Sequence, residues 1–483
     1  MIVQLTGAPA LSAATGLKSP NAATRSQAVS SARRQMAALS AGQLDFRQRL
    51  TAAGITATVR AQFTQVLDAV ALTVPSSQLS QLARVPGVAA VYPDATMHAT
   101  ADEDVSLIGA PQVWQTADPS GRPDQGAGEV VAVVDTGIDY NHPDLGGGFG
   151  PGHKVAAGYD FVNNKPDPMD DNGHGTHVAG IIAADPAEPG GRTGVAPKAT
   201  LTAYKVLDSS GSGLESTVIE GLETAVSVDN PYRAAVVNMS LGGPSAPGDP
   251  LDQASEDAVR SGAVVVAAAG NSGPGTSTVG SPAEAPDVLA VGASIGGIDT
   301  PTVAVTSPVR EPISASRLNL SANPPTGGED LGLVDVGNGQ PSSYDGLDVA
   351  GKAVLVSYSS FAVNQQLLTA EQHGAAAVLF HTPNYYSYTG SQPGPVLPSF
   401  AAGVSDNPGK LSLVAVVIDG TNATDLQQWL AQGPVQIHVG SSDATDEIAA
   451  FSAHGPARSS YDLKPDLVAP GVEIGSTWLN GQY

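Results

Sequence analysis

The sequence predicts an α/β fold, with a mainly parallel sheet and helices on both of its faces. From Gly126 onward, short continuous runs of Val, Ala and Leu alternate with amphipathic helical patterns, which is typical of parallel strands buried on both faces. The 55 glycines and 37 prolines provide many tight turns between short elements. In such a sheet, functional side chains are expected beyond the carboxyl ends of the strands.

The expected elements of this sheet follow one another in a regular order. Strand patterns occupy residues 128–137, 199–208, 234–243 and 263–273. Helical patterns lie between them at residues 175–185, 214–228 and 251–262. The main sheet is expected to resume late in the chain, at residues 449–456 and 463–472.

Two further domains are expected beside this sheet. Residues 1–98 combine a long helical pattern from Ser26, two strand patterns, a second helix and an edge strand, which indicates a small α+β domain. Residues 310–440 carry strands, helices and turns of their own. They are therefore interpreted as an inserted domain, mixed α/β or β-rich, between two parts of the main domain, 104–305 and 441–483.

Composition excludes several classes of function. The net charge of −24 argues against nucleic-acid or anionic-membrane partners, which an acidic surface repels. There is no cysteine, so disulfides and thiolate zinc sites are excluded. The apolar run Ala263–Ala269 is far shorter than the ~18 residues of a membrane-spanning helix. We expect no membrane insertion.

An aspartate and a histidine stand where catalytic groups are expected. Asp135 ends an apolar strand just before a Thr-Gly turn, so its carboxylate can orient a histidine. The alternative is a purely structural role, in which the side chain caps the turn. His174 lies between two glycines before a helix, which leaves its ring exposed above the sheet. His177, one turn later, is interpreted as a core histidine. A metal pair with His174 is the alternative, without a Glu or Cys at ligand spacing.

Asn271 lies near the end of the strand pattern 263–273, after its apolar run. Its amide can donate to a developing oxyanion, and an Asn-Ser-Gly turn is the alternative. Together, these segments resemble the subtilisin-like serine proteases. VVAVVDTGIDYNHPDL is similar to the aspartate motif of that family, NGHGTHVAG to its histidine motif, NMSLGG to a substrate-binding strand and AAAGNSG to its oxyanion asparagine. The order Asp, then His, is also that of the family.

The resemblance implies a serine endopeptidase and a role for each residue. His174 would be the general base, Asp135 would hold its tautomer, and Asn271 would donate to the oxyanion. The two strands that pair with the substrate backbone would contain Ser240, Leu241 and Gly242 on one side and Ser212 and Gly213 on the other. The primary specificity pocket would be lined by Ala268, Ala269 and Gly270.

The resemblance also assigns the flanking domains. Residues 1–98 resemble the inhibitory propeptide of the family, and the insert resembles a protease-associated domain. The implied partners are protein or peptide substrates and the chain's own propeptide. Secretion is implied too, although MIVQLTGAPA at the start lacks the basic and apolar regions of a signal peptide.

The nucleophile is the one triad member that the sequence does not supply. In the family it lies in a Gly-Thr-Ser-Met-Ala-like motif shortly after the KPDLVAPG strand, whereas here Ser476 precedes Thr477 and matches a position upstream of that motif. Ser272 and Ser281 correspond to structural loops. We therefore expect a fragment truncated at both ends, lacking the export signal and the nucleophile, and inactive as it stands.

Two other functions stay open at this point. A pseudoprotease or peptide-binding module would use the same cleft without hydrolysis, and a metal-dependent hydrolase would use His174 and His177. No cofactor is expected. Asp144 matches a position where some subtilases bind calcium, but the loop ADPAEPGGRTG lacks their usual asparagines, so a structural role is preferred.

Overall fold

The computed structural model forms two compact units, Met1–Gly296 with Ile448–Tyr483, and Gly297–Glu447. No described helix is long and apolar enough to cross a membrane. The structure describes all residues except 13, 15, 18, 20, 95, 100–104, 106, 120, 187–190, 297–298, 314, 318–320, 323–326, 358–362, 382–411, 419, 444–446, 450 and 473.

The first unit is built on a seven-stranded sheet in which every neighbouring pair is parallel. This confirms the predicted α/β fold. In spatial order the strands are β22 (Leu467–Pro470), β13 (Leu289–Ser294), β12 (Val264–Ala268), β10 (Val236–Met239), β6 (Val130–Asp135), β8 (Thr200–Lys205) and β7 (Val155–Asp160).

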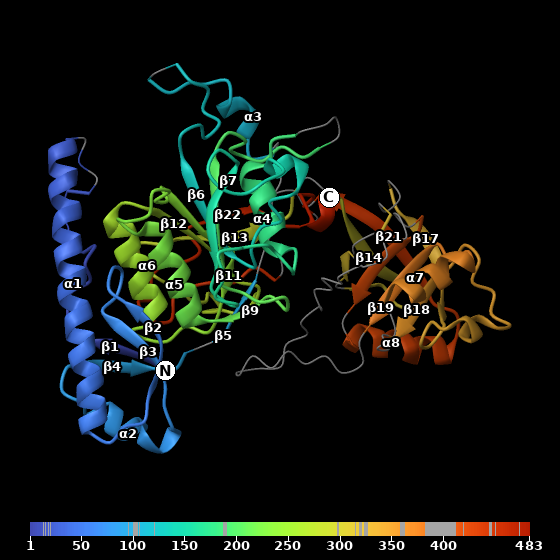
Figure 1. The fold of residues 1–483 in the computed structure, drawn as a ribbon. Coiled ribbons are helices and arrows are strands. Elements are labelled where there is room, and N and C mark those ends of the chain that lie inside the picture. The colour runs from blue at the N-terminus through green and yellow to red at the C-terminus, as the bar shows by residue number, and fades with distance from the viewer. Residues whose placement is uncertain are drawn as a thin grey trace. The chain divides into compact units, whose positions relative to one another are not determined.

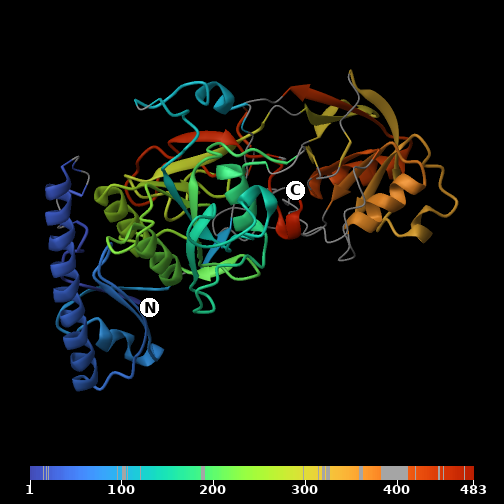
Figure 2. The same cartoon turned by 45° about the horizontal axis from the view of Figure 1, so that its top comes forward.

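Helices lie on both faces of this sheet (Figures 1 and 2). On β6, Val131 and Val133 pack in the cluster of α4 (His174–Ala183), while Ala132 and Val134 pack in the cluster of α5 (Glu215–Val226). The alternation follows from the period of two along a strand. Helix α6 (Pro250–Ser261) lies beside α5, and the short α3 (Ala110–Val113) precedes the sheet.

The N-terminal part of this unit is an antiparallel sheet covered by one long helix. Its helix α1 (Ala22–Ala52) begins after Asn21, whose side chain accepts from the backbone N–H groups of Ala23 and Thr24. The expected second helix is reduced to a 3-10 turn (Ser76–Gln78) and α2 (Leu79–Leu82), because Pro86 follows closely. The strands, in spatial order, are β2 (Thr58–Phe63), β3 (Ala69–Thr73), β1 (Ile2–Leu5) and β4 (Val88–Tyr92).

The second unit contains a mixed eight-stranded sheet. It begins before residue 310, where the insert was expected to start, because β14 pairs along its length with β21. Helices α7 (Val363–Gln372) and α8 (Gly420–Gln432) belong to this unit. Its strands, in spatial order, are β15 (Glu311–Ile313), β14 (Asp299–Ser307), β21 (Gln436–Asp443), β17 (Glu329–Asp335), β18 (Ala353–Ser357), β19 (Ala377–His381), β20 (Val414–Ile418) and β16 (Ala315–Arg317).

A third, small sheet lies in the first unit. Strand β5 (Thr96–Ala99) runs antiparallel between β9 (Ser212–Leu214) and β11 (Leu241–Gly242). Residues that follow the N-terminal sheet are therefore held, through their backbone, between two segments of the main domain.

Candidate active site

The carboxylate of Asp135 and the ring of His174 are brought together at the carboxyl edge of the main sheet. Asp135 is the last residue of β6, and His174 is the first residue of α4. His174 Nδ1 lies 2.8 Å from Asp135 Oδ1. The Asp135 side chain is fully buried and that of His174 is 16% exposed. A buried carboxylate bonded to Nδ1 fixes the tautomer that leaves Nε2 as the proton acceptor.

Small residues make this approach possible. A Cβ on Gly175 would overlap the carbonyl oxygen of Gly137, so α4 can pack against the end of β6 only with glycine there. Gly137 itself has a φ of 112°, and a Cβ on it would lie 2.6 Å from the carbonyl oxygen of Pro168. Gly137 in the aspartate motif and Gly175 in the histidine motif are thus required by backbone packing.

The start of α4 is held by polar groups that the sequence alone did not single out. Asp170 accepts from the backbone N–H of Gly173 at 3.0 Å and from the hydroxyl of Thr176 at 2.6 Å. The Thr136 hydroxyl accepts from the N–H of Gly175 at 2.8 Å. Thr136 lies within the aspartate motif and Asp170 lies two residues before the histidine motif, and this closeness to the motifs was the available signal.

Strands β9 and β11 contain residues expected to bind substrate and are the two rims of the expected cleft, and the extended segment β5 lies between them. Met97 pairs with Gly213 and His98 with Ser212 on one side, while His98 also pairs with Gly242 on the other. Strand addition of this kind supplies backbone hydrogen bonds from both rims. Leu241 pairs with Ala99, so β5 runs antiparallel to β11 as well as to β9.

A pocket opens at the carboxyl ends of the neighbouring strands. Asn271, which is exposed, lies on its wall together with the predicted residues Ser240, Ala268 and Gly270. Ala269, which was also expected to line the specificity pocket, is buried and is not among the residues of this wall. The other residues of the wall are Asn238, Val266, Ala267, Val291, Gly292, Ala293, Phe451, Ala469 and Gly471.

The serines near the site have other partners. The hydroxyl of Ser476 is buried and donates to the carbonyl of His177 at 2.7 Å. Ser281 Oγ lies 2.9 Å from Asp249 Oδ1 and 2.7 Å from Asp252 Oδ1. Ser272 is exposed in the loop after β12. The contacts of Ser476 are those of a residue that anchors its segment to α4.

His177 and Asp144, which were considered as possible metal ligands, both contact protein groups. His177 Nε2 lies 3.3 Å from the carbonyl oxygen of Ile474, and burial lowers the pKa of the ring. Asp144 accepts from the backbone N–H of Arg192 at 2.8 Å and is fully buried. Among the described residues, no group of three or more His, Cys, Asp or Glu side chains could hold a metal ion.

Comparison with known proteins identifies the family. The sequence model of the subtilase family matches residues 126–483, which contain the Asp135–His174 pair and both rims of the cleft. The chain belongs to the subtilase family.

Several relatives are similar to this chain over different lengths. The minor extracellular protease Vpr of Bacillus subtilis is 32% identical over 441 residues, covering 87% of this chain and 51% of the relative. Serine protease AprX of the same species is 38% identical over 49% of this chain and 53% of its own length. Subtilisin E is 42% identical over 49% of this chain and 58% of its own length. The chain thus spans about half the length of these relatives.

Proposed function

We propose that this protein is the precursor of a serine endopeptidase that cleaves peptide bonds in extended substrates. The observation that carries the proposal is the buried Asp135–His174 pair, with a 2.8 Å Nδ1–Oδ1 distance, at the edge of a cleft that holds β5 by backbone pairing. His174 would take the proton of a serine nucleophile and return it to the leaving amine. Asn271 would donate to the oxyanion from the wall of the pocket.

We further propose that the nucleophile of the active enzyme lies outside these 483 residues. Ser476 is a poor candidate because its hydroxyl is bonded to the His177 carbonyl. One face of the sheet also exposes apolar side chains, with Val264 52% and Leu467 43% exposed. A helix packed on these strands would cover them and could carry the serine to His174.

Activity assays test this proposal directly. The 483-residue chain should neither hydrolyse casein nor react with a fluorophosphonate. The complete gene product should do both, and Asp135→Asn or His174→Ala should lower kcat/KM by roughly 10⁴- to 10⁶-fold. His438→Ala is the matched control, since His438 Nδ1 lies 2.9 Å from Asp330 Oδ1 in a second, exposed pair of the other unit. Hydrolysis by the complete product that survives His174→Ala would exclude the triad mechanism.

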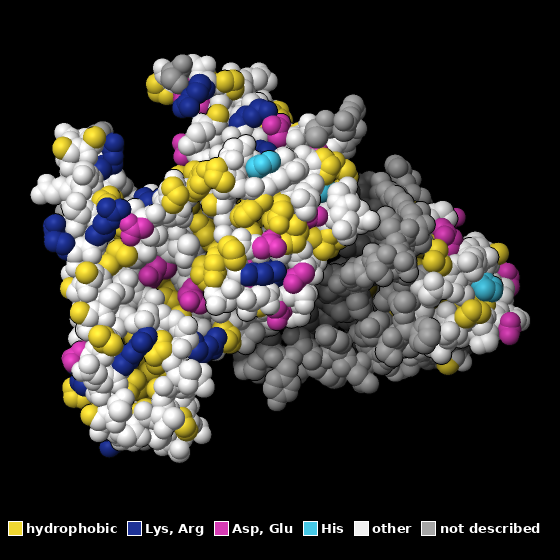
Figure 3. Space-filling view, viewed as in Figure 1, with side chains coloured by type: hydrophobic (Ala, Val, Ile, Leu, Met, Phe, Trp, Pro, Cys, Tyr) yellow, Lys and Arg dark blue, Asp and Glu magenta, His cyan; other side chains and the backbone are white. Residues whose placement is uncertain are grey.

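The N-terminal domain is proposed to be an inhibitor that occupies the cleft. Glu223 on α5 accepts from the backbone N–H of Thr64, at 3.1 Å, and Ser216 donates its hydroxyl to Asp94 at 2.6 Å. Residues 1–98 carry eight Lys and Arg against three Asp and Glu, in a chain of net charge −24. Figure 3 shows basic side chains spread over this domain, at the left. The purified domain should inhibit the mature enzyme, and added salt should weaken the inhibition.

A peptide-binding protein without hydrolytic activity is the second candidate. The pairing of β5 between β9 and β11 favours it, because binding of this kind requires no nucleophile. Peptide binding by a complete gene product that leaves casein intact would support this function.

An extracellular location is proposed because the relative Vpr is an extracellular protease. Detection of the protein in the culture medium of its native host would test it.

A further inference from the structure

Lys205 is a buried cation beside the Asp135–His174 pair that the proposed mechanism does not use. It ends β8, where it pairs with Asp135 on the neighbouring strand β6. Its side chain is only 1% exposed. Burial of an ammonium group costs several kcal/mol unless its donors are paired, so the partners of Lys205 identify what it holds.

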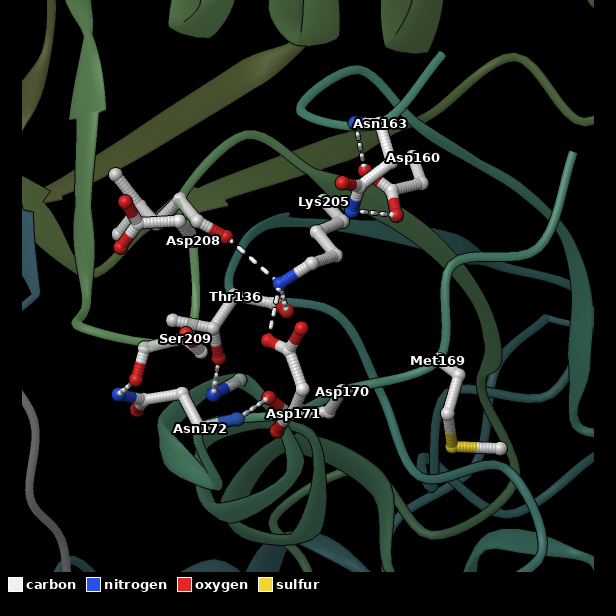
Figure 4. Close-up of polar contacts among 12 residues, drawn as sticks. Thr136, Asp160, Asn163, Met169, Asp170, Asp171, Asn172, Lys205, Asp208 and Ser209 are labelled. Atoms are coloured by element: carbon white, nitrogen blue, oxygen red, sulfur yellow. Dashed lines mark hydrogen bonds and ion pairs between the residues drawn. The ribbon is translucent and has the colours of Figure 1, made fainter. Parts of the chain in front are cut away.

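All three donors of the ammonium group have acceptors. Lys205 Nζ donates to the carbonyl of Thr136 at 2.7 Å, to the carbonyl of Leu207 at 2.9 Å and to Asp171 Oδ1 at 2.7 Å. Figure 4 shows the Lys205 side chain reaching toward Thr136 and Asp171. An ammonium has three N–H groups, so each acceptor engages one of them.

The first acceptor is the carbonyl of Thr136, whose own backbone N–H binds the Asp135 carboxylate. The backbone N–H of Thr136 donates to Asp135 Oδ1 at 2.6 Å, the same oxygen that faces His174 Nδ1. The Thr136 hydroxyl accepts from Gly175 N. A shift of the Thr136 peptide would therefore move the carboxylate and the start of α4 together.

The second acceptor lies in the loop that carries the histidine. Asp171 stands between Asp170, which accepts from Gly173 N at 3.0 Å, and Asn172, whose side chain accepts from His174 N at 3.1 Å. The ion pair with Lys205 thus ties the histidine loop to the end of β8. Asp171 is 51% exposed, so this tether can be changed without opening the core.

The third acceptor leads to the rim of the cleft. Leu207 is followed by Asp208, whose backbone N–H donates to the Ser212 carbonyl at 2.9 Å and whose carboxylate accepts from Ser212 N at 3.2 Å. Ser212 begins β9, which pairs with β5. One ammonium group therefore bonds the segments that carry the carboxylate, the histidine and one substrate rim.

We propose that Lys205 is a positioning residue that sets the Asp135–His174 hydrogen bond. The catalytic importance of that pair rests on the proposed function, but the test measures the Asp135–His174 hydrogen bond itself. In the 483-residue chain, ¹⁵N-histidine NMR should show a downfield His174 Nδ1–H resonance. Asp135→Asn, which changes the acceptor, assigns it by a large upfield shift.

The decisive comparison is between two buried lysines. Lys464 is 2% exposed and donates to the Val288 carbonyl at 2.7 Å and to Asp466 at 2.8 Å, but it lies at the amino ends of β13 and β22. Lys205→Met should remove or broaden the His174 resonance. Lys464→Met should lower stability similarly and leave the resonance in place. Loss in both variants, or in neither, would overturn the proposal.

Asp171→Ala covers the case in which Lys205→Met does not fold. Because the Asp171 side chain is half-exposed, this variant should fold and shift the resonance upfield, by less than Asp135→Asn does. An unchanged resonance in folded Asp171→Ala would also overturn the proposal. Failure of the complete protein to hydrolyse casein, with the NMR response intact, would remove the protease proposal and leave the positioning role of Lys205 standing.

Discussion

At the scale of single residues, the Ser281 hydroxyl lies within hydrogen-bond distance of two buried carboxylates, Asp249 and Asp252. One hydroxyl proton cannot serve both, so one carboxyl group must itself be protonated and donate. Burial, followed by the charge of Asp249, raises the pKa of Asp252 from 3.8 to about 8. Burial also raises the pKa of Asp249, so the pair retains a proton at neutral pH.

This proton makes the stability of the first unit depend on pH. Because the pKa of Asp252 is raised in the folded state, its contribution is complete below pH ~4 and is lost as pH rises through 8, at up to about 1.4 kcal/mol per pH unit. Asp252→Asn keeps a donor at every pH and should flatten this dependence. Urea unfolding at pH 5 and pH 8 measures it. Asp287→Asn, at a half-exposed carboxylate, is the control, and parallel curves for wild type and Asp252→Asn would contradict the prediction.

At the scale of elements, the contact between β6 and α4 depends on one helical glycine. Gly175→Ala would place a methyl group against the backbone of Gly137 and 3.2 Å from Asp135 Cβ, so α4 must move away from the strand. We expect a loss of about 1–3 kcal/mol in unfolding free energy, together with a longer Asp135–His174 hydrogen bond.

Gly42→Ala provides the matched comparison, because Gly42 lies within α1 and has nothing within 4 Å of an added Cβ. It should stabilise the N-terminal domain by about 0.5–1 kcal/mol. The unfolding free energy of Gly175→Ala is measured by chemical denaturation followed by tryptophan fluorescence. That of Gly42→Ala is measured by circular dichroism, which reports the helix. Stabilisation by both substitutions would show that α4 tolerates the methyl group.

At the scale of the whole molecule, the second unit should fold alone when it is cut at its structural boundaries. The fragment 297–447 retains the β14–β21 pairing, and it should unfold cooperatively. A fragment of residues 310–440 loses β14 and should be unfolded or much less stable. Urea titrations of the two fragments measure the difference. Equal stability would mean that β14 contributes nothing to this unit.

The exposed apolar face of the main sheet predicts self-association of the first unit. Val264 on β12 and Leu467 on β22 lie on the same face of the sheet, on either side of β13, and are 52% and 43% exposed. The double substitution Val264→Glu, Leu467→Glu should reduce the binding of a dye that reports exposed apolar surface, and it should reduce concentration-dependent association. Leu44→Glu, at a 57% exposed leucine of α1, is the control. Light scattering that responds equally to both variants would contradict the prediction.

Much of the site could be predicted because its chemistry follows local patterns. Asp135 and His174 were predicted from a strand end and a glycine-flanked helix start, and the structure places them 2.8 Å apart. Ala269 was assigned to the specificity pocket by the resemblance alone, and its side chain is buried in the structure. Lys205 was missed because its hydrogen-bond acceptors on Thr136 and Asp171 lie far from it in the sequence, so no local pattern marks this lysine.

The sequence by itself determined the α/β fold, because apolar periodicity and turn glycines act over a few neighbouring residues, and it indicated the family through the resemblance of the motifs that contain Asp135, His174 and Asn271. Only the tertiary structure decided which groups meet. The three acceptors of Lys205 lie on separate segments, and β5 pairs with strands more than 100 residues away along the chain. The acceptors of Lys205 meet because parallel strands end at a common edge, and β5 is placed by pairing with distant strands, so no local pattern records these contacts.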